Sequence, residues 1–403
     1  MFIHLPLLRF HRNLSLVKLH GLWGIYLGDL FRRLATSFVG LFIPIYIWQV
    51  TGKLIFVPVY YFIYAFVGMV SNYPGALFIR RFGVDWSVVI GTFFRALFII
   101  LLIFAKSNQS FFWLSALCFG LAQPFDWLPY YYVISKISNI KHHFGNAAGI
   151  SNLIAHIGSA LGPVIGGIII KTLGFGWLYS ISGGMLVLAA LLPFLDEFEK
   201  SGMHVSGREI IERLKDSGMK KHLLSYGLRM FDNLAHMVVW PLFLYVIVGS
   251  FESSGALQTM SLLIAVIVSY GVGRITDKNN FNLIYLGSLL SALSWWGRLI
   301  LQSATGLFIT NTSYTVGSTM VWTPHTALLL AKSSEKYTME FWLVRQTICY
   351  GFMALFSVLF FIILFFTENF SGIFLALGTT SLLTLFLPYW YREYIYEIKE
   401  SKE

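Results

Sequence analysis

Long apolar runs dominate this chain, and they constrain its fold more than any other feature. A bilayer core about 30 Å thick requires about 20 apolar residues per helix, and the sequence offers roughly twelve such runs between short polar segments. They predict an all-α membrane protein with twelve transmembrane helices. The expected spans are 34–51, 55–78, 86–105, 111–134, 146–170, 175–195, 224–249, 256–273, 282–302, 306–330, 341–366 and 371–390.

The composition agrees with a lipid environment and excludes several other classes. Hydrophobic residues make up 57% of the chain and charged residues 12%, which is too apolar for a soluble protein. The net charge of +10 does not indicate nucleic-acid binding, because the basic residues lie between apolar runs and form no stripe on a polar domain. Cys118 and Cys349 both lie in apolar runs, so the sequence offers no disulfide framework or zinc pattern.

The distribution of Lys and Arg predicts the orientation of the spans. Of the 29 basic residues, 22 lie in the N-terminal segment, the even-numbered loops and the C-terminal segment. The odd-numbered loops hold only Lys53, Lys106 and Lys171. Because basic residues near span ends stay on the cytoplasmic side, both termini are expected in the cytoplasm of a protein of the cytoplasmic (inner) membrane.

The two halves of the sequence resemble each other. Pro44 and Pro241 are 197 residues apart, and so are Arg32 and Arg229. Two further segment pairs agree within one or two residues of this offset: 90–98 with 286–294, and 127–136 with 322–332. Such a repeat predicts two pseudo-symmetric six-helix bundles with a cleft between them.

One long polar stretch divides the chain near its middle. Within 196–222, Ser206 and Glu209 have the spacing of a capping box, and Gly218 supplies a stop. Ile210, Ile211 and Leu214 form one apolar face, which predicts a short amphipathic helix on the cytoplasmic surface. A solvated linker helix is the alternative. The expected domains are 1–195, the N-terminal six-helix bundle; 196–222, the linker; and 223–403, the C-terminal six-helix bundle.

The fifth span is rich in glycine at regular spacings. Glycines four residues apart let helix backbones approach closely in lipid, and a proline among them removes one backbone hydrogen bond. The pattern resembles the antiporter motif of the major facilitator superfamily, G-x8-G-x3-GP-x2-GG, at Gly149, Gly158, Gly162, Pro163, Gly166 and Gly167. The alternative interpretation is ordinary packing of small residues.

Two further motifs of this superfamily are partly present. Its members carry G-x-x-x-D-[RK]-x-G in the loop between spans two and three, often repeated between spans eight and nine. Simple topogenic charge is the alternative interpretation of the basic residues in these loops. The second loop fits at Gly273, Asp277 and Lys278, and the first at Gly83 and Arg81, with Arg80 in place of the acid. The R-x-x-Q-G pattern of drug exporters keeps only its glutamine, Gln123.

Ionisable residues inside the spans are candidates for function, because a charge at membrane depth costs at least about 2.5–3.5 kcal/mol on insertion scales. The resemblance implies that spans one, four, seven and ten line the cleft, and therefore that Asp126, Asp232, His236 and His325 face a translocation path. Asp126 is the first choice for a proton or cation site, because a carboxyl group away from water binds a proton more readily. A structural ion pair with Arg95 is the alternative.

Other residues in the spans have two interpretations each. Arg345 can contact an anionic substrate or make gating contacts at the cytoplasmic mouth. Trp127 and Trp322 can form an aromatic lining or simply pack between helices. Arg32 and Arg298 are expected to extend toward the membrane surfaces.

One ion pair is expected within span seven. Arg229 and Asp232 are three residues apart, so their side chains lie on the same face of a helix.

These patterns predict a secondary transporter that alternates access by rocking two bundles about a central cleft. The leading hypothesis is efflux of an apolar or cationic small molecule in exchange for protons. The alternatives are a symporter or facilitator for a sugar, a metabolite or an organic anion, and, in a different class, a non-transporting membrane scaffold or an intramembrane enzyme. We expect no enzymatic activity, cofactor, metal or nucleic acid; the expected partners are a small-molecule substrate, protons and the lipid bilayer, and the protein is expected to be a monomer.

Overall fold

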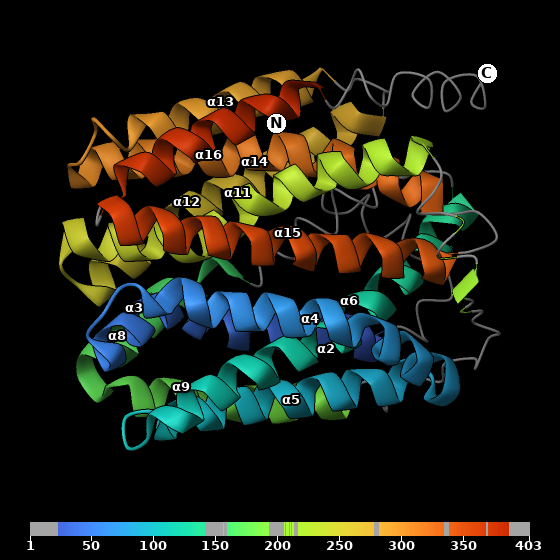
Figure 1. The fold of residues 1–403 in the computed structure, drawn as a ribbon, viewed down its shortest axis with the longest axis horizontal. Helices are drawn as coiled ribbons and strands as arrows, with labels where there is room; N and C mark the ends of the chain where they lie inside the picture. The colour runs from blue at the N-terminus through green and yellow to red at the C-terminus, as the bar shows by residue number, and fades with distance from the viewer. Residues whose placement is uncertain are drawn as a thin grey trace, which may run out of the picture.

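The structure is a computed structural model in which every regular element of the described residues is helical. The described residues are 23–141, 156, 159–192, 205, 207–208, 210, 212, 217–277, 282–333, 338–367 and 370–386. Figure 1 shows the long helices running side by side along the longest axis of the molecule. They are α2 (Trp23–Gly40), α3 (Ile43–Thr51), α4 (Phe56–Phe82), α5 (Val84–Phe104), α6 (Gln109–Lys141), α8 (Gly162–Leu173), α9 (Phe175–Leu191), α11 (Ser217–Val248), α12 (Phe251–Asp277), α13 (Leu283–Gly297), α14 (Ala304–Ser333), α15 (Thr338–Thr367) and α16 (Ser371–Leu383), followed by the 3-10 turn η3 (Thr384–Phe386).

Each of the twelve expected spans overlaps a described helix. By length and apolar composition, six stretches of the described residues could cross a membrane, and the crossing of the other six spans stays a prediction. The six are Leu30–Thr51, Phe56–Phe82, Val84–Phe104, Leu224–Val248, Phe251–Thr276 and Thr338–Thr367.

The first span differs from the expected single helix. α2 ends at Gly40, and α3 begins at Ile43 after a turn in which the amide of Phe42 donates to the carbonyl of Val39. Pro44 stands in the first turn of α3, where its missing N–H leaves no helical hydrogen bond unmade. The interruption therefore follows from the proline, and the apolar composition of the run does not reveal it.

The segment between the two halves also differs from the expectation. Gly218 lies inside α11, which begins at Ser217, so it does not end a linker helix. Ser206, Glu209, Ile211 and Leu214 lie outside the described residues, so the predicted capping box stays untested. Val205 is buried, and its carbonyl accepts a hydrogen bond of 3.3 Å from the Arg80 Nη1 at the end of α4. The linker therefore contacts the N-terminal half.

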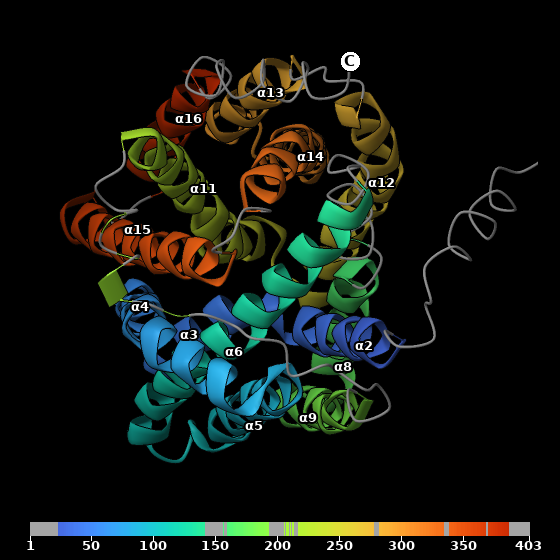
Figure 2. The same cartoon turned by 90° about the vertical axis from the view of Figure 1, so that its right-hand side faces the viewer.

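The helices form two groups that correspond to the two halves of the sequence. Viewed end-on in Figure 2, helices α2 to α9 lie together on one side and α11 to α16 on the other. Within the groups, α5 packs on α6 and α9, and α13 packs on α14 and α16. Between the groups, α4 packs on α15 and α8 on α12. α3 also meets α11, and α6 meets α14 and α15, across the division.

Large apolar side chains are exposed on several helices of both groups. Ile267 in α12, Leu293 in α13 and Phe366 near the end of α15 are exposed. An apolar outer surface is unfavourable in water and suits hydrocarbon, so it agrees with a protein surrounded by lipid.

Candidate functional site

The glycines of the fifth span bring three helices into close contact. A Cβ atom at Gly166 would lie 2.3 Å from the Phe38 carbonyl oxygen of α2. A Cβ at Gly167 would lie 2.4 Å from the carbonyl oxygen of Phe251, the first residue of α12. α8 therefore contacts α2 of the N-terminal half and α12 of the C-terminal half.

The rest of the motif is partly described. Gly162 packs against Ser37 of α2, and Pro163 lies in the first turn of α8, where its carbonyl faces Gly255 of α12. Gly149 and Gly158 lie outside the described residues.

The two halves are joined at the end of the molecule where α8 ends and α12 begins, which we call the Lys171 end. Lys171 of α8 forms an ion pair with Glu252 of α12. Gln49 of α3 donates to the Tyr245 hydroxyl of α11 over 3.2 Å. The Phe251 ring of α12 lies 5.5 Å from that of Phe175 in α9, centroid to centroid. These contacts join the halves at this end.

The opposite end is joined by a separate set of contacts, which we call the Trp342 end. The hydroxyls of Ser135 in α6 and Ser333 in α14 are 2.8 Å apart, and the Trp342 indole N–H donates to Ser135 over 2.8 Å. The ring of Tyr131 stacks on Trp342 at a centroid distance of 4.3 Å. Side chains therefore hold the halves together at both ends.

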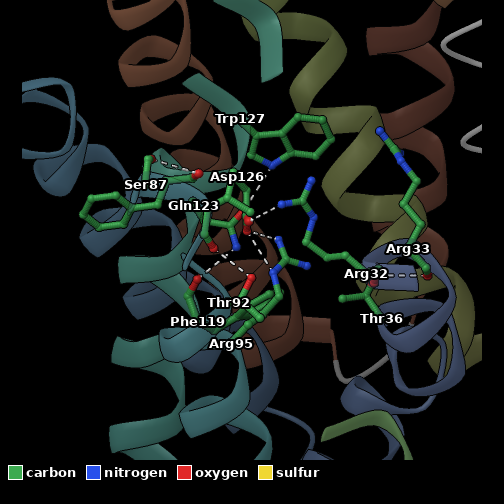
Figure 3. A network of polar contacts seen from close by, with 12 residues as sticks. Arg32, Arg33, Thr36, Ser87, Thr92, Arg95, Phe119, Gln123, Asp126 and Trp127 are labelled. Carbon is green, nitrogen blue, oxygen red and sulfur yellow. Dashed lines mark hydrogen bonds and ion pairs between the residues drawn. The ribbon is translucent and has the colours of Figure 1, made fainter. Parts of the chain in front are cut away.

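Asp126 is the centre of a buried ionic network in the N-terminal half (Figure 3). Arg95 of α5 donates its Nε to Asp126 Oδ2 over 2.8 Å and its Nη2 to the same oxygen, and Arg32 of α2 reaches Oδ1 over 3.2 Å. The ion pair of Asp126 with Arg95, which the sequence offered as the alternative to a proton or cation site, is present. Arg32 is buried in this network, so the expectation that it extends toward the membrane surface is wrong. The Asp126 carboxylate offsets part of the cost of burying this guanidinium.

One turn away on α6, Gln123 links the two halves. Its Oε1 accepts hydrogen bonds from the indole of Trp127 over 3.2 Å and from the hydroxyl of Tyr350 in α15 over 2.8 Å. Trp127 also lies under the guanidinium of Arg33, at 5.9 Å from its ring centroid. Trp127 therefore packs within this polar cluster, and Gln123 is the residue that reaches the other half.

Asp232 is the corresponding centre of the C-terminal half. Arg229 pairs with its Oδ2 at 2.5 Å, which confirms the expected ion pair. The Trp295 indole donates to Oδ1 at 2.5 Å and the Tyr314 hydroxyl to Oδ2 at 3.0 Å. The hydroxyl of Ser381 completes the network. All these groups come from α11, α13, α14 and α16, so Asp232 faces the interior of its own half.

Arg345 of α15 lies between the halves. Its guanidinium carbon lies 4.2 Å from the ring centroid of Tyr131 in α6 and 3.8 Å from that of Tyr226 in α11. It donates to the Tyr131 hydroxyl at 3.3 Å and to Gln346 at 3.0 Å. Within the described part of the chain, no carboxylate lies within ion-pair distance of Arg345. This buried cation is held by aromatic faces from both halves.

The remaining candidate residues lie near these networks. The His325 ring is 5.3 Å from that of Tyr226, and the Trp322 ring lies 5.6 Å from the guanidinium carbon of Arg229. His236 stacks on Tyr314 at 4.3 Å. Asp126 and Asp232 lie in separate networks, one in each half, and the roles of Asp126, Asp232 and His325 in transport stay predictions.

The loop motif is only partly described. Gly83 joins α4 to α5 with a φ of 92°, a conformation that favours glycine. Arg80 donates a hydrogen bond to the Val205 carbonyl of the linker, and the Arg81 guanidinium carbon lies 5.3 Å from the ring centroid of its neighbour Phe82. Gly273 is inside α12, whereas the Asp277 side chain and Lys278 lie outside the described residues.

Arg298 adds to an excess of buried arginines over buried acids. It is 0% exposed, so the expectation that it extends toward the outer surface is wrong. The reason is that α13 ends at Gly297, five residues before the expected end of the span, and the side chain turns back among aromatic rings. Among the described residues, the buried arginines are Arg32, Arg95, Arg229, Arg298 and Arg345, and the buried acids are Asp126, Asp232 and Glu340.

The sequence did not point to the aromatic residues that hold these charges. Arg345 lies against the rings of Tyr131, Tyr226 and Trp342, and Arg298 lies against those of Trp295 and Tyr314. Trp295 and Tyr314 also donate hydrogen bonds to Asp232. Only their high frequency in the spans was visible, because apolar packing and cation binding use the same rings.

Comparison with known proteins agrees with this fold. The Major Facilitator Superfamily model matches residues 25–338, and no curated protein sequence matches significantly. The human organic anion transporter MFSD10 (TETRAN) is similar in structure, with a TM-score of 0.67 and 12% identity over 91% of this chain and 98% of that chain. A variant of the E. coli fucose:proton symporter FucP has a TM-score of 0.63 and 12% identity over 90% of this chain and 96% of that chain. Since the family match covers most of the chain, this protein belongs to the Major Facilitator Superfamily of multi-pass membrane transporters.

Proposed function

We propose that this protein is a secondary transporter that carries small organic anions across the membrane by alternating access of its two halves. The observation that supports this most directly is the surplus of buried positive charge: five arginines against three acids among the described buried residues. Arginine stays protonated in proteins, so this surplus cannot be removed by losing a proton.

A buried positive surplus favours a negatively charged ligand. Taking a guanidinium out of water costs several kcal/mol unless a partner offsets it, and an anion bound between the halves would offset this cost. Arg345 is placed to do this, because aromatic groups of both halves surround it and no described carboxylate neutralises it. A fixed fork of N–H donors also suits carboxylate or phosphate oxygens.

The same surplus disfavours the cationic substrate of the leading sequence-based hypothesis. A cation would be repelled by the unpaired arginines in a medium of low dielectric. Proton coupling through Asp126 would require Arg32 or Arg95 to move away, because both guanidiniums form ion pairs with this carboxylate. Efflux and proton exchange therefore stay proposals, and the organic-anion alternative has the stronger support.

Transport by the purified protein in liposomes tests this proposal. A panel of radiolabelled compounds of similar size is offered: a dicarboxylate, a sugar phosphate, a neutral sugar and an organic amine. We expect flux of an anionic compound only, inhibited by other anions. Flux of the amine or the sugar alone would contradict the proposal, and no flux of any compound would favour a scaffold. An imposed proton gradient in each direction then determines the coupling and its sign.

Replacing Arg345 by glutamine is expected to reduce anion flux at low concentration by about tenfold or more. A hydrogen bond to a charged group contributes about 1.5–3 kcal/mol, and its loss should appear mainly as weaker apparent affinity. Arg345→Lys should retain part of the activity, because it keeps the charge and loses the fork.

A matched control for Arg345 is Arg274→Gln. Arg274 also lies over an aromatic ring, Tyr270, at 4.7 Å, but it is exposed. Anion flux through the Arg274→Gln variant should stay at the wild-type level. Equal losses in the two variants, or none in Arg345→Gln, would remove Arg345 from the substrate site.

Both termini are expected in the cytoplasm, as the basic residues predict. A C-terminal green fluorescent protein fusion should fluoresce in bacterial cells, and alkaline phosphatase fused after Lys106 should be active. An active phosphatase at the C-terminus would overturn this orientation.

A further inference from the structure

Arg298 is a fully buried cation whose hydrogen-bond donors have no partner. Its exposure is 0%, and its Nε, Nη1 and Nη2 make no hydrogen bond with the described residues. The guanidinium carbon lies 4.0 Å from the ring centroid of Trp295, 4.1 Å from that of Trp240 and 5.2 Å from that of Tyr314. We call these four residues the Arg298 cage.

The aromatic walls stabilise the charge without using its donors. Cation–π attraction acts through the faces of the rings, whereas the five N–H groups of a guanidinium lie in its own plane. Leaving charged donors unpaired in a buried position is costly, and the aromatic contacts do not remove that cost. The cage is thus incomplete without a group that accepts these hydrogen bonds.

The acid that contacts the cage, Asp232, already accepts hydrogen bonds from other donors. Asp232 accepts the polar hydrogens of two cage residues, Trp295 and Tyr314, and forms its ion pair with Arg229. No ion pair within the described part of the chain includes Arg298. The C-terminal half therefore contains two buried arginines near one aspartate, which leaves one positive charge at Arg298.

Further polar groups with unfilled capacity lie around the cage. The Gln258 side-chain oxygen accepts from Trp240 over 2.9 Å and from the Asn311 amide over 3.1 Å, which leaves the Asn311 Oδ1 without a partner. His236 stacks on Tyr314 and, at 6.3 Å, on Trp240, and its Nδ1 also has no partner. His236 is only partly buried, so the cage borders a less enclosed position on α11.

We propose that the Arg298 cage is a binding site for a small monovalent anion, either a halide ion or the carboxylate of an organic acid. One unneutralised positive charge calls for one negative charge, and aromatic walls that exclude water strengthen the attraction between them. The planar fork of donors fits two carboxylate oxygens or one compact ion. The site lies within the C-terminal half, on α11, α13 and α14, and is separate from Arg345 between the halves.

Anion-dependent stability of the full-length protein in detergent tests this inference. The protein is prepared in sodium sulfate at constant ionic strength and titrated with sodium chloride or sodium acetate. A ligand that binds only the folded state raises its stability, so we expect a saturable rise of about 2–5 °C in apparent Tm. Tryptophan fluorescence should change with the same midpoint, because Trp240 and Trp295 are in the cage. A response to chloride indicates a halide site, and a response to acetate alone indicates a carboxylate site.

The variants identify the residue responsible. Arg298→Gln should lose the anion response, whereas Arg345→Gln and the exposed Arg274→Gln should keep it. Arg298→Lys keeps the charge without the fork and should shift the midpoint to higher anion concentration. Absence of a saturable response in the wild type, or its persistence in Arg298→Gln, would overturn the site. Because this readout is binding and not flux, it can fail while organic-anion transport is observed, and the reverse also holds.

Discussion

Replacing Asp126 by alanine is expected to destabilise the protein by about 3–5 kcal/mol and to abolish transport. The aspartate is buried and forms ion pairs with two arginines, Arg32 from α2 and Arg95 from α5. Removing it leaves both guanidiniums buried without a carboxylate, and each repels the other. The three helices that meet at this point belong to one half, so the loss should loosen that half as a unit.

Apparent Tm and monodispersity in detergent measure this effect, with flux in liposomes as the second readout. Asp126→Asn should also be destabilised, because it keeps the shape and loses the charge. Combining Asp126→Ala with Arg95→Met should restore part of the stability, since one unpaired charge is removed. The control is Glu252→Gln, which breaks an exposed pair with Lys171 and should change Tm little. If Asp126→Asn were as stable as the wild type, the network would not be a structural centre.

Replacing Gly255 by leucine is expected to reduce transport by about tenfold or more while the protein still folds. A Cβ at Gly255 would lie 2.1 Å from the Pro163 carbonyl oxygen, which is backbone and cannot turn away. The larger side chain should force α8 and α12 apart and hold the Lys171 end open. Alternating access requires each end to close in turn, so a protein held in one state cannot complete the cycle.

Spin labels on exposed residues at the Lys171 end can measure this opening. We would place one at Lys53 in the N-terminal half and one at Ser303 in the C-terminal half, and expect a longer distance in Gly255→Leu. Gly271→Leu is the matched control, because Gly271 lies on the same helix with nothing within 4 Å of its Cβ position. Its distance and flux should match the wild type. Unchanged transport in Gly255→Leu would show that this close approach is not needed for closure.

Several features of the site could be predicted from local sequence. Arg229 and Asp232 are three residues apart on one helix, so their pairing follows from helical geometry. The glycines of α8 also predict a close helix contact, because without a Cβ two helix backbones can approach more closely. Arg95 is the one basic residue within the third expected span, which made it a possible partner for Asp126.

Other features could not be predicted. Arg298 lies at the end of an apolar run, where extension toward the surface is the usual outcome, and only the early end of α13 turned it inward. Arg345 is held by Tyr131 and Tyr226, which are far from it in the sequence. The surplus of unpaired arginines, which changed the favoured substrate from a cation to an anion, became visible only when these contacts were known.

The sequence by itself determined the helical membrane fold, the division into two halves and the positions of the buried charges along the chain. These follow from hydropathy and helix period, which act over one span at a time. Only the tertiary structure decided which charges neutralise one another and which remain unpaired. Burial and electrostatic energy depend on neighbours from other helices, and no single span contains that information.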